Sequence, residues 1–439
     1  MNIFWVSLGC AKNQADSEWM MAECLRKGWH ITDGPEHADV IVVNTCGFIE
    51  AAVNESIDTI LALVKWRKTG PCKSLIVIGC LVERYREKLQ ASLPEVDLFV
   101  GTAGFDRIVF LIEFAGDFRG CYLPSLERID VCLPAPPRRL SAPGFAYIKI
   151  AEGCDRHCTY CIIPRLRGRQ KSRPIQSIVA EARSLIDAGA MELVLVAQET
   201  TAYGKDLADG THIADLCRAL AGISETVWIR ILYGHPSSID ERLIETVRET
   251  PNVLPYFDIP IQHASDRVLR QMGRDYGKAD ILRLIERIRN RIEHAVIRTT
   301  VITGFPGENR TDFAMLKSLI KQVRFDHLGV FAYSDAEDIP AHGLPAPVPR
   351  RTALARKDRI MALQMDISQK RLEAYIGKRV EVLIENRLED ELWEGRTWFQ
   401  APEVDGGVIV TGTELAVGQR VWINVRDSLE YDLMGEVLA

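Results

Sequence analysis

The chain has 439 residues, enough for two to four domains that each bury a core of their own. Its composition is ordinary for a soluble protein. The chain holds no run of about 18 apolar residues, and its first residues lack the basic and apolar regions of a signal peptide. We therefore expect a cytoplasmic protein. The net charge of −6 is unevenly spread, since residues 372–439 hold 6 Lys/Arg and 14 Asp/Glu, a net −8, against +2 for residues 1–371.

Residues 1–115 alternate short, β-branched apolar runs with amphipathic stretches, a pattern that predicts a parallel α/β sheet. The expected strands cover 2–10, 39–46, 74–80 and 97–101, with helices at 15–28, 50–67 and 82–92. Three of these strands end in a cysteine, namely Cys10, Cys46 and Cys80. Because the carboxyl ends of the strands line the ligand crevice of open α/β sheets, we expect the three thiols to converge there.

A linker and a second α/β region are expected next. Residues 116–144 have scattered prolines and little periodicity, and we place the linker at 116–139. Within 140–371, strand-like runs alternate with helices six times, which predicts a partial (β/α)6 barrel, open on one side, rather than a closed barrel of eight units. The expected strands are 145–153, 192–199, 227–234, 254–262, 296–306 and 327–334, followed by a charged amphipathic helix at 349–375.

The tail, 372–439, contains short strand-like runs separated by turns, the pattern of a small β-barrel. The expected strands are 378–387, 407–412, 419–428 and 432–438.

Three more cysteines follow the first expected barrel strand. The stretch AEGCDRHCTYCIIP (151–164) holds Cys154, Cys158 and Cys161, at the face where barrel enzymes place their active sites. Three thiolates can each bind one iron of a 4Fe-4S cluster and leave the fourth iron without a protein ligand. A structural zinc with His157 as the fourth ligand is the alternative. We favour the cluster, because the loop lies at a catalytic face and zinc ligands usually come in spaced pairs.

This spacing, with Tyr160 before the last cysteine, resembles the signature of the radical S-adenosylmethionine (SAM) enzymes. The resemblance implies that SAM binds the open iron through its amino and carboxylate groups. It also implies that the reduced cluster cleaves SAM to methionine and a 5′-deoxyadenosyl radical. Such chemistry suits C–H bonds that are too weakly acidic for a general base.

Two further segments support this resemblance. VITGFPGE (301–308) is similar to the segment that lines the adenosyl end of the cofactor, and AQETTAYG (197–204) ends the second barrel strand. The resemblance therefore implies cofactor contacts from Tyr160, Gln198, Gly304 and Glu308. The alternative for the glycine-rich segment is a tight turn that needs positive φ at Gly304 or Gly307.

SLGCAKNQADSE (7–18), NTCGF (44–48) and GC (79–80) resemble the N-terminal domain of the methylthiotransferases. That family uses these three cysteines for a second 4Fe-4S cluster, on which exogenous sulfur can bind an open iron, and its C-terminal TRAM domain is similar to the tail of this chain. A single cysteine is more often a small buried hydrophobe. We expect core filler or a surface thiol at the remaining five, Cys24, Cys72, Cys121, Cys132 and Cys217.

Within this family one branch modifies adenosine in transfer RNA, and another modifies an aspartate of small-subunit ribosomal protein twelve. SLGCAKN, YIKIAEGC, CIIP, YFDIPIQHAS and EGRTWFQAPEVDG resemble the second branch. The tail charge of −8 favours it too, because an acidic domain repels phosphates and attracts a basic protein. A solvated acidic face without a partner is the alternative. ILYGHP (231–236) and YSDAEDIPAH (333–342) depart from the family pattern.

Some side chains stay undecided from the sequence. The basic run 165–173 could contact RNA, bind the carboxylate of the cofactor, neutralise the anionic cluster region or be solvated; its cations are Arg165, Arg167, Arg169, Lys171 and Arg173. His235 and His263 could contact substrate or serve as structural hydrogen-bonding residues.

The resemblance implies a monomeric transferase with two 4Fe-4S clusters. One SAM would supply the radical that removes hydrogen from the β-carbon of the aspartate, and another would supply the methyl group. An electron donor such as flavodoxin and a sulfur donor are also implied, with neither membrane attachment nor tight nucleic-acid binding. The alternatives are a transfer-RNA adenosine methylthiotransferase and a non-enzymatic iron-sulfur carrier or scaffold.

Overall fold

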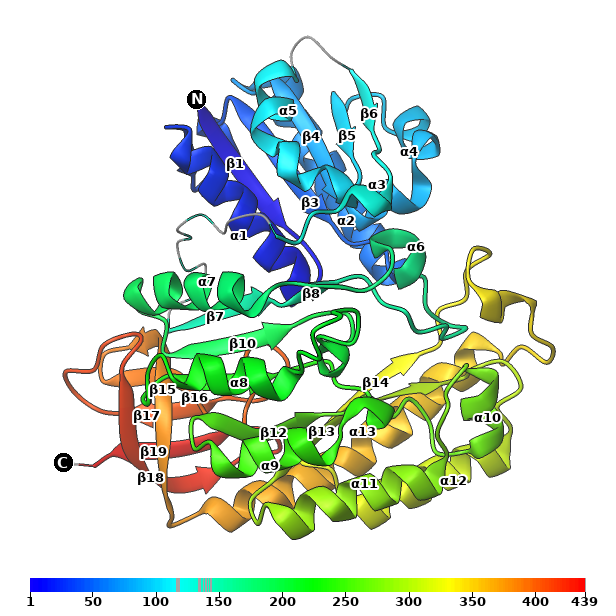
Figure 1. The fold of residues 1–439 in the computed structure, drawn as a ribbon, viewed down its shortest axis with the longest axis vertical. Coiled ribbons are helices and arrows are strands. Elements are labelled where there is room, and N and C mark those ends of the chain that lie inside the picture. The colour runs from blue at the N-terminus through cyan, green and yellow to red at the C-terminus, as the bar shows by residue number, and fades with distance from the viewer. Residues whose placement is uncertain are drawn as a thin grey trace.

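The computed structural model describes residues 1–115, 119–132 and 144–438, with the single residues 136, 138, 140 and 142 between them. Three parts follow one another along the chain (Figure 1). They are a parallel sheet between residues 2 and 122, a partial barrel between 145 and 332, and a closed β-barrel between 379 and 437. We call them the first sheet, the partial barrel and the C-terminal β-barrel.

The first sheet has six parallel strands in the order β2-β1-β3-β4-β5-β6. Apolar residues fill β3 and β4, which are buried along their whole length because helices cover both faces. The strands are β1 (Asn2–Ser7), β2 (His30–Thr32), β3 (Val40–Thr45), β4 (Ser74–Gly79), β5 (Leu98–Val100) and β6 (Gly120–Tyr122). The helices are α1 (Ala11–Arg26), α2 (Glu50–Thr69), α3 (Cys80–Tyr85), α4 (Glu87–Ser92) and α5 (Ile108–Phe114).

This sheet is larger than the sequence pattern predicts. The short strands β2 and β6 were not expected, and β6 pairs with β5 inside the segment expected to be a linker. The helix expected over 82–92 is interrupted at Arg86, whose φ of 50° separates α3 from α4. Of the remaining expected linker, positions 116–118, 133–135, 137 and 139 lie outside the described residues.

The partial barrel is an open sheet of six parallel strands in the order β14-β13-β12-β11-β10-β7, which confirms the predicted (β/α)6 arrangement. Its strands are β7 (Phe145–Lys149), β10 (Glu192–Val196), β11 (Trp228–Ile231), β12 (Val253–Asp258), β13 (Val296–Thr303) and β14 (His327–Ala332), with the hairpin β8 (Ala151–Glu152) and β9 (Lys171–Ser172) beside them. Its helices are α6 (Ile163–Arg167), α7 (Ile175–Asp187), α8 (Ile213–Ala221), α9 (Glu241–Glu249), α10 (Asp266–Gln271), α11 (Lys278–Arg291), α12 (Arg310–Val323) and α13 (Arg350–Leu372).

The C-terminal β-barrel closes in the order β15-β16-β17-β19-β18. Its strands are β15 (Arg379–Glu389), β16 (Leu392–Thr397), β17 (Val408–Thr411), β18 (Arg420–Ser428) and β19 (Leu433–Val437). Four of them were expected. β16 lies in the EGRTWFQ segment, where a glycine and charged residues hide the alternation that usually reveals a strand.

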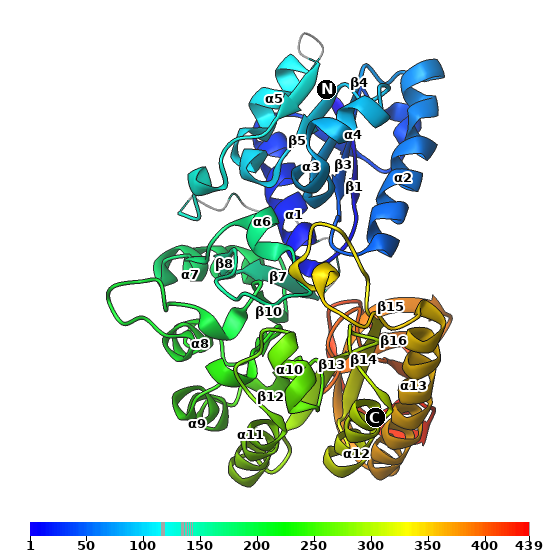
Figure 2. The same cartoon turned by 90° about the vertical axis from the view of Figure 1, so that its right-hand side faces the viewer.

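The two faces of the partial-barrel sheet pack differently. The helices cover one face and form the largest hydrophobic cluster of the molecule, whereas the other face packs against the C-terminal β-barrel through Phe145, Tyr147, Trp228 and Tyr256. Charges are buried at the same contact: the Arg230 side chain is 0% exposed between Glu192 and the main chain of the C-terminal β-barrel. Figures 1 and 2 show the first sheet stacked above the partial barrel and the C-terminal β-barrel beside it.

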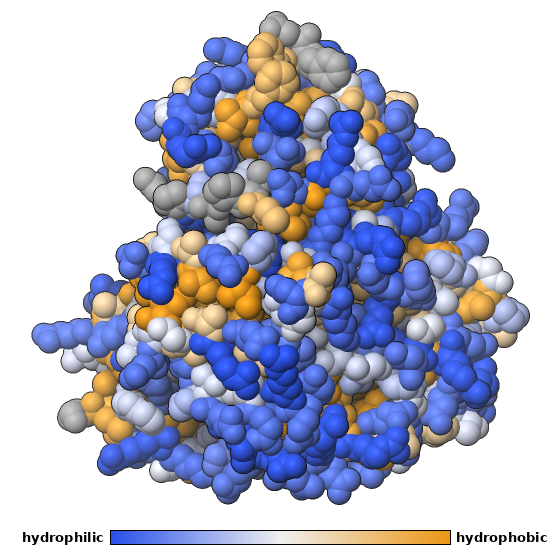
Figure 3. Space-filling view, viewed as in Figure 1, coloured by the Kyte–Doolittle hydropathy of each residue, from blue (hydrophilic) through white to orange (hydrophobic). Residues whose placement is uncertain are grey.

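The outer surface is mainly polar. On the face in Figure 3, hydrophilic side chains cover the outer helices α8, α9 and α11, and hydrophobic side chains gather near α7. Among the described residues, no helix combines the length and the apolarity that crossing a bilayer requires.

Candidate active site

The cysteines of the C-x3-C-x2-C stretch lie in one loop between β8 and α6. The backbone N–H of Arg156 donates to Cys154 Sγ at 3.4 Å, and that of Ile163 donates to Cys161 Sγ at 3.5 Å. The N–H of Cys161 donates to the carbonyl of Cys158 at 3.1 Å, which closes a tight turn. The loop therefore offers three thiols together with backbone N–H donors to sulfur, which is the donor set of an iron-sulfur site.

Gly153 fixes the entry to this loop. Its φ is +75°, and a Cβ there would lie 2.1 Å from the carbonyl oxygen of Arg169. Burial raises the pKa of Cys154 to about 11 and that of Cys161 to about 12. These two groups are therefore protonated thiols at neutral pH until a metal displaces their protons.

The second group of cysteines comes from three neighbouring strands of the first sheet. Cys10, Cys46 and Cys80 follow β1, β3 and β4, which are adjacent in the sheet order, so the expected convergence is confirmed. A Cβ on Gly9 would lie 2.7 Å from Cys46 Cβ, and one on Gly47 would lie 2.9 Å from the main chain of Cys80. Only glycine at these two positions allows the strand ends to approach so closely. Burial raises the pKa of Cys80 to about 11.

We call Cys10, Cys46 and Cys80 the sheet triad and Cys154, Cys158 and Cys161 the loop triad. Cys80 of the sheet triad packs in one hydrophobic cluster with Ile162, which directly follows the loop triad, and with Leu166 of α6. The hydroxyl of Thr102 donates to the carbonyl of Leu166 at 2.6 Å. Helix α6 thus holds the first sheet against the partial barrel at the point where the triads lie.

A buried ionic network reinforces this contact. Arg167, with its side chain 2% exposed, donates to Asp16 Oδ2 at 2.7 Å, to Glu152 Oε2 at 3.3 Å and to Asn13 Oδ1 at 2.6 Å. Lys149 also binds Asp16, and it binds Glu152 at 2.7 Å. Two cations thus share two carboxylates, and the neighbouring Lys149 and Arg167 outweigh the effect of burial and lower the pKa of Glu152 to about 2.

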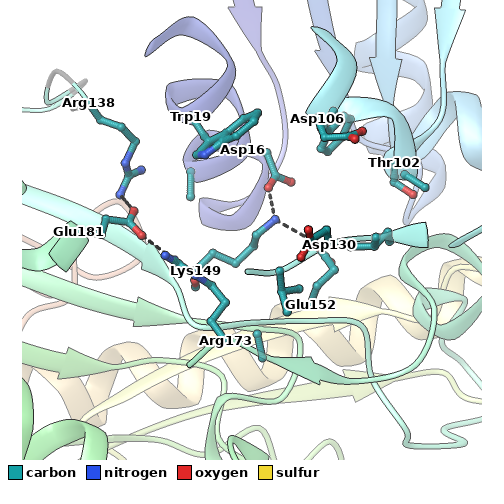
Figure 4. A pocket seen from close by; sticks show the side chains of 16 residues that line it. Asp16, Trp19, Thr102, Asp106, Asp130, Arg138, Lys149, Glu152, Arg173 and Glu181 are labelled. Carbon is teal, nitrogen blue, oxygen red and sulfur yellow. Dashed lines mark hydrogen bonds and ion pairs between the residues drawn. The ribbon is translucent and has the colours of Figure 1, made fainter. Parts of the chain in front are cut away.

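Figure 4 shows the Asp16, Lys149 and Glu152 part of this network at the wall of a cavity of about 110 Å³. Lys149 reaches up from the partial barrel between Asp16 and Glu152, while Glu181 lies between Arg138 and Arg173. Arg138 also pairs with Glu18 at 2.9 Å, which adds a second link to α1. The sequence did not reveal this network, because the pairs that link α1 to Arg138, Lys149 and Arg167 are more than 100 positions apart in the chain.

The four predicted cofactor contacts lie near the carboxyl ends of the barrel strands. Tyr160 accepts a hydrogen bond at 3.0 Å from Nε of Arg274, and Gln198 donates to Glu152 Oε1 at 2.7 Å. Glu308 accepts from the backbone N–H of Gly304 and pairs with Arg356 at 3.1 Å. Gly304 and Gly307 have φ of +78° and +79°, as the turn explanation requires. Contact with a cofactor stays a prediction for all four.

The two undecided histidines are buried and make local hydrogen bonds. His235 Nδ1 accepts from the backbone N–H of Ser237 at 3.2 Å, and burial, assisted by the cation Arg274, lowers the pKa of His235 to about 3. His263 Nδ1 accepts from the N–H of Ser265 at 2.9 Å. Its Nε2 is buried with no hydrogen-bond partner among the described residues and lies 4.0 Å from Glu308 Oε1.

The basic run contributes mainly to the structure of the loop region. Besides Arg167, Arg173 pairs with Glu181 at 2.5 Å, and Lys171 donates to the carbonyl of Glu127 at 2.6 Å. Arg165 and Arg169 are exposed, Arg169 with 88% of its side chain accessible, but Arg165 donates to the carbonyl of Asp338 at 2.7 Å and Arg169 pairs with Asp155 at 3.3 Å. The run is therefore not a free cationic surface.

The remaining cysteines behave as expected. Cys24, Cys72 and Cys217 are buried, Cys121 is partly buried and Cys132 is exposed. In the part of the chain that the structure describes, no three His, Cys, Asp or Glu side chains gather closely enough to hold a single metal ion. A four-iron cluster spreads its thiolates around a cube instead of gathering them at one point, so a cluster site does not require the geometry of a single-ion site.

Three family models match successive parts of the chain: Uncharacterized protein family UPF0004 at residues 2–101, the Radical SAM superfamily at 148–320 and the TRAM domain at 376–438. Among full-length relatives, "Ribosomal protein uS12 methylthiotransferase RimO" of Desulfosudis oleivorans is 50% identical and covers 99% of this chain and 100% of its own. The protein of the same name from Clostridioides difficile is 45% identical and covers 98% of this chain and 98% of its own. The one from Aquifex aeolicus is 44% identical and covers 99% of this chain and 97% of its own.

Solved structures share the fold at low identity. The radical S-adenosylmethionine methyltransferase TsrM from Kitasatospora setae superposes with a TM-score of 0.60 at 15% identity, over 78% of this chain and 77% of that chain. The cobalamin-dependent S-adenosylmethionine radical enzyme OxsB gives a TM-score of 0.52 at 12% identity, over 82% and 56%.

Proposed function

The chain belongs to the family of ribosomal protein uS12 methylthiotransferases named RimO, and from this premise we propose that it places a methylthio group on the β-carbon of an aspartate of uS12. It is a transferase of the radical SAM superfamily, which implies one 4Fe-4S cluster and SAM. The observation that carries the proposal is the pair of three-cysteine groups, one at the carboxyl ends of adjacent strands of the first sheet and one in the loop before α6.

The loop triad fits the cluster that binds SAM. Two of its thiols, Cys154 and Cys161, receive backbone N–H donors. Two buried polar atoms without hydrogen-bond partners among the described residues, Gln198 Oε1 and His263 Nε2, follow the ends of barrel strands β10 and β12 in the chain. Cys154, Cys158 and Cys161 would hold this cluster, which would supply the electron for cleavage of SAM and so the radical chemistry needed at an unactivated C–H bond. Gln198, Gly304 and Glu308 would line the site, and Tyr160 would support the loop.

We assign a second 4Fe-4S cluster to the sheet triad. Its three thiols lie at the carboxyl ends of adjacent strands, and the two glycines at close contacts keep them near one another. This cluster would carry the sulfur that is transferred, and a second SAM would supply the methyl group. The reaction also needs a sulfur donor and an external one-electron donor of the flavodoxin type.

The acidic C-terminal β-barrel supports a basic protein as substrate. Residues 372–439 carry a net −8, which attracts a basic ribosomal protein and disfavours tight nucleic-acid binding. We propose that the chain acts as a cytoplasmic monomer. Its domains would cover 1–115, 140–371 and 372–439, and β6 (Gly120–Tyr122) would extend the first domain beyond residue 115.

Mass spectrometry of uS12 and of transfer RNA from cells that lack this protein tests the proposal. We expect uS12 to lose the mass of a methylthio group that replaces a hydrogen, while transfer RNA stays unchanged. A missing methylthio group on adenosine, with uS12 unaffected, would instead support the transfer-RNA branch.

A further inference from the structure

A groove of about 620 Å³ lies where the three parts of the molecule meet. The first sheet lines it with Cys10 and Gln14, the partial barrel with Tyr147 and Tyr233, and the C-terminal β-barrel with Glu403. It therefore joins the C-terminal β-barrel to Cys10 of the sheet triad along one continuous surface.

Lys12 lies beside this groove, two positions after Cys10 in the first turn of α1. Its Nζ is 3.2 Å from the centroid of the Tyr233 ring. Tyr233 follows β11 with a φ of 62°, a left-handed conformation that a bulky residue rarely adopts, and its N–H donates to Asp258 Oδ2 at 2.8 Å. Strained conformations of this kind gather at functional sites, and this one places the ring between the ammonium group and the barrel.

The ammonium group of Lys12 differs from its buried cationic neighbours in its lack of a carboxylate partner within the described part of the chain. Lys149 and Arg167 are matched by Asp16 and Glu152, whereas no carboxylate pairs with Lys12 among the residues that the structure describes. The face of an aromatic ring attracts a cation without neutralising it. A buried charge is costly unless it is paired, so the site is suited to an anion that arrives with a ligand.

We propose that Lys12 binds the side-chain carboxylate of the substrate aspartate and thereby holds the β-carbon beside the sheet triad. The inference rests on the proposed function, which supplies the aspartate. The carboxylate carbon is bonded directly to the β-carbon, so an ion pair with Lys12 fixes the reacting atom close to Cys10 and to the barrel rim. An adenosine base has no such group, and Lys12 is thus a specificity-determining residue for a protein substrate.

A double-mutant cycle tests this contact. The protein is loaded with both clusters and SAM and is either unaltered or carries Lys12→Met. Its binding is measured to two forms of fluorescently labelled uS12, one with the natural aspartate and one with asparagine in its place. We expect Lys12→Met to weaken binding of the aspartate form about 10-fold or more, the value of a hydrogen bond to a charged group. Binding of the asparagine form should change less than about twofold. The matched control is Lys27→Met, just beyond the same helix, where an exposed ammonium pairs with Glu113 at 2.9 Å.

The rival role for Lys12 is to offset the negative charge of a cluster at Cys10. That role predicts a changed reduction potential of the second cluster and equal losses with both forms of uS12, a result that would overturn the proposal. Circular dichroism and iron content report whether Lys12→Met folds and loads. Lys12→Gln gives a second variant, which should show the same discrimination between the two substrates. If the unaltered chain neither binds nor modifies uS12, the proposed function falls and this inference with it.

Discussion

Replacing Arg167 with methionine should release α1 from the partial barrel. The side chain is 2% exposed and contacts Asp16, Glu152 and Asn13 at 2.7, 3.3 and 2.6 Å. Without it, Lys149 alone faces two buried carboxylates. Removal of one partner from a buried ion pair costs about 3–5 kcal/mol. We expect the lower part of this range, about 3 kcal/mol, because Lys149 keeps part of the compensation.

Hydrogen–deuterium exchange of the α1 amides measures this loss as local opening, without assuming that a chain of several domains unfolds in one step. A loss of about 3 kcal/mol corresponds to about 100-fold faster exchange. The control is Arg169→Met, whose side chain is 88% exposed and pairs with Asp155; such surface pairs contribute about 0–1 kcal/mol. In the double variant with Asp16→Asn, the losses should be less than additive. Exchange of α1 that stays within about threefold of the unaltered protein would refute the structural role of the network.

Three further predictions concern other parts of the molecule. The pKa of Glu192 is lowered in the folded protein because Arg230 and Arg396 outweigh the effect of its burial. The ionised carboxylate therefore stabilises the folded state above about pH 4.3, the pKa of a glutamate in the unfolded chain, and this contribution is lost as the pH falls below that value. Protease release of the C-terminal β-barrel should therefore increase on acidification, and Glu192→Gln should raise release at neutral pH and flatten the pH dependence. Gly9→Ala should lower iron binding at the sheet triad, because the added Cβ would lie 2.7 Å from Cys46 Cβ. The control Gly28→Ala should keep its iron, because Gly28 has a similar positive φ but no heavy atom within 4 Å of an added Cβ. Equal iron contents in the two variants would contradict this prediction. Cys217→Ala should lower thermal stability through lost packing yet keep full iron, and a loss of iron would show that this thiol is a ligand.

The features that the sequence predicted correctly are those with a local pattern. The alternation of β-branched runs with amphipathic helices predicted both parallel sheets. Because Cys10, Cys46 and Cys80 each follow such a run, their place at one edge of the sheet could be inferred from the sequence alone. The C-x3-C-x2-C loop was equally local, since its spacing alone restricts the thiols to one short segment.

The features that the sequence did not predict depend on contacts between distant segments. β16 has a weak alternation and exists because β15 and β17 pair on either side of it. The charges of Asp16 and Arg167 look like solvated helix residues in the sequence, yet they pair across 151 positions. Lys12 and Tyr233 likewise meet only when the first sheet stacks on the partial barrel. No local rule of propensity or periodicity contains this information.

The most direct test of the central claim is high-resolution mass spectrometry of uS12 after reaction in vitro with the reconstituted protein, SAM, a sulfur donor and a reductant. We predict that a methylthio group appears on one aspartate, and that Cys158→Ala abolishes both this product and 5′-deoxyadenosine. Cys46→Ala should abolish the methylthio product while 5′-deoxyadenosine still forms. Methylthiolation of uS12 that persists after loss of Cys46, or modification of transfer RNA instead of uS12, would contradict the account.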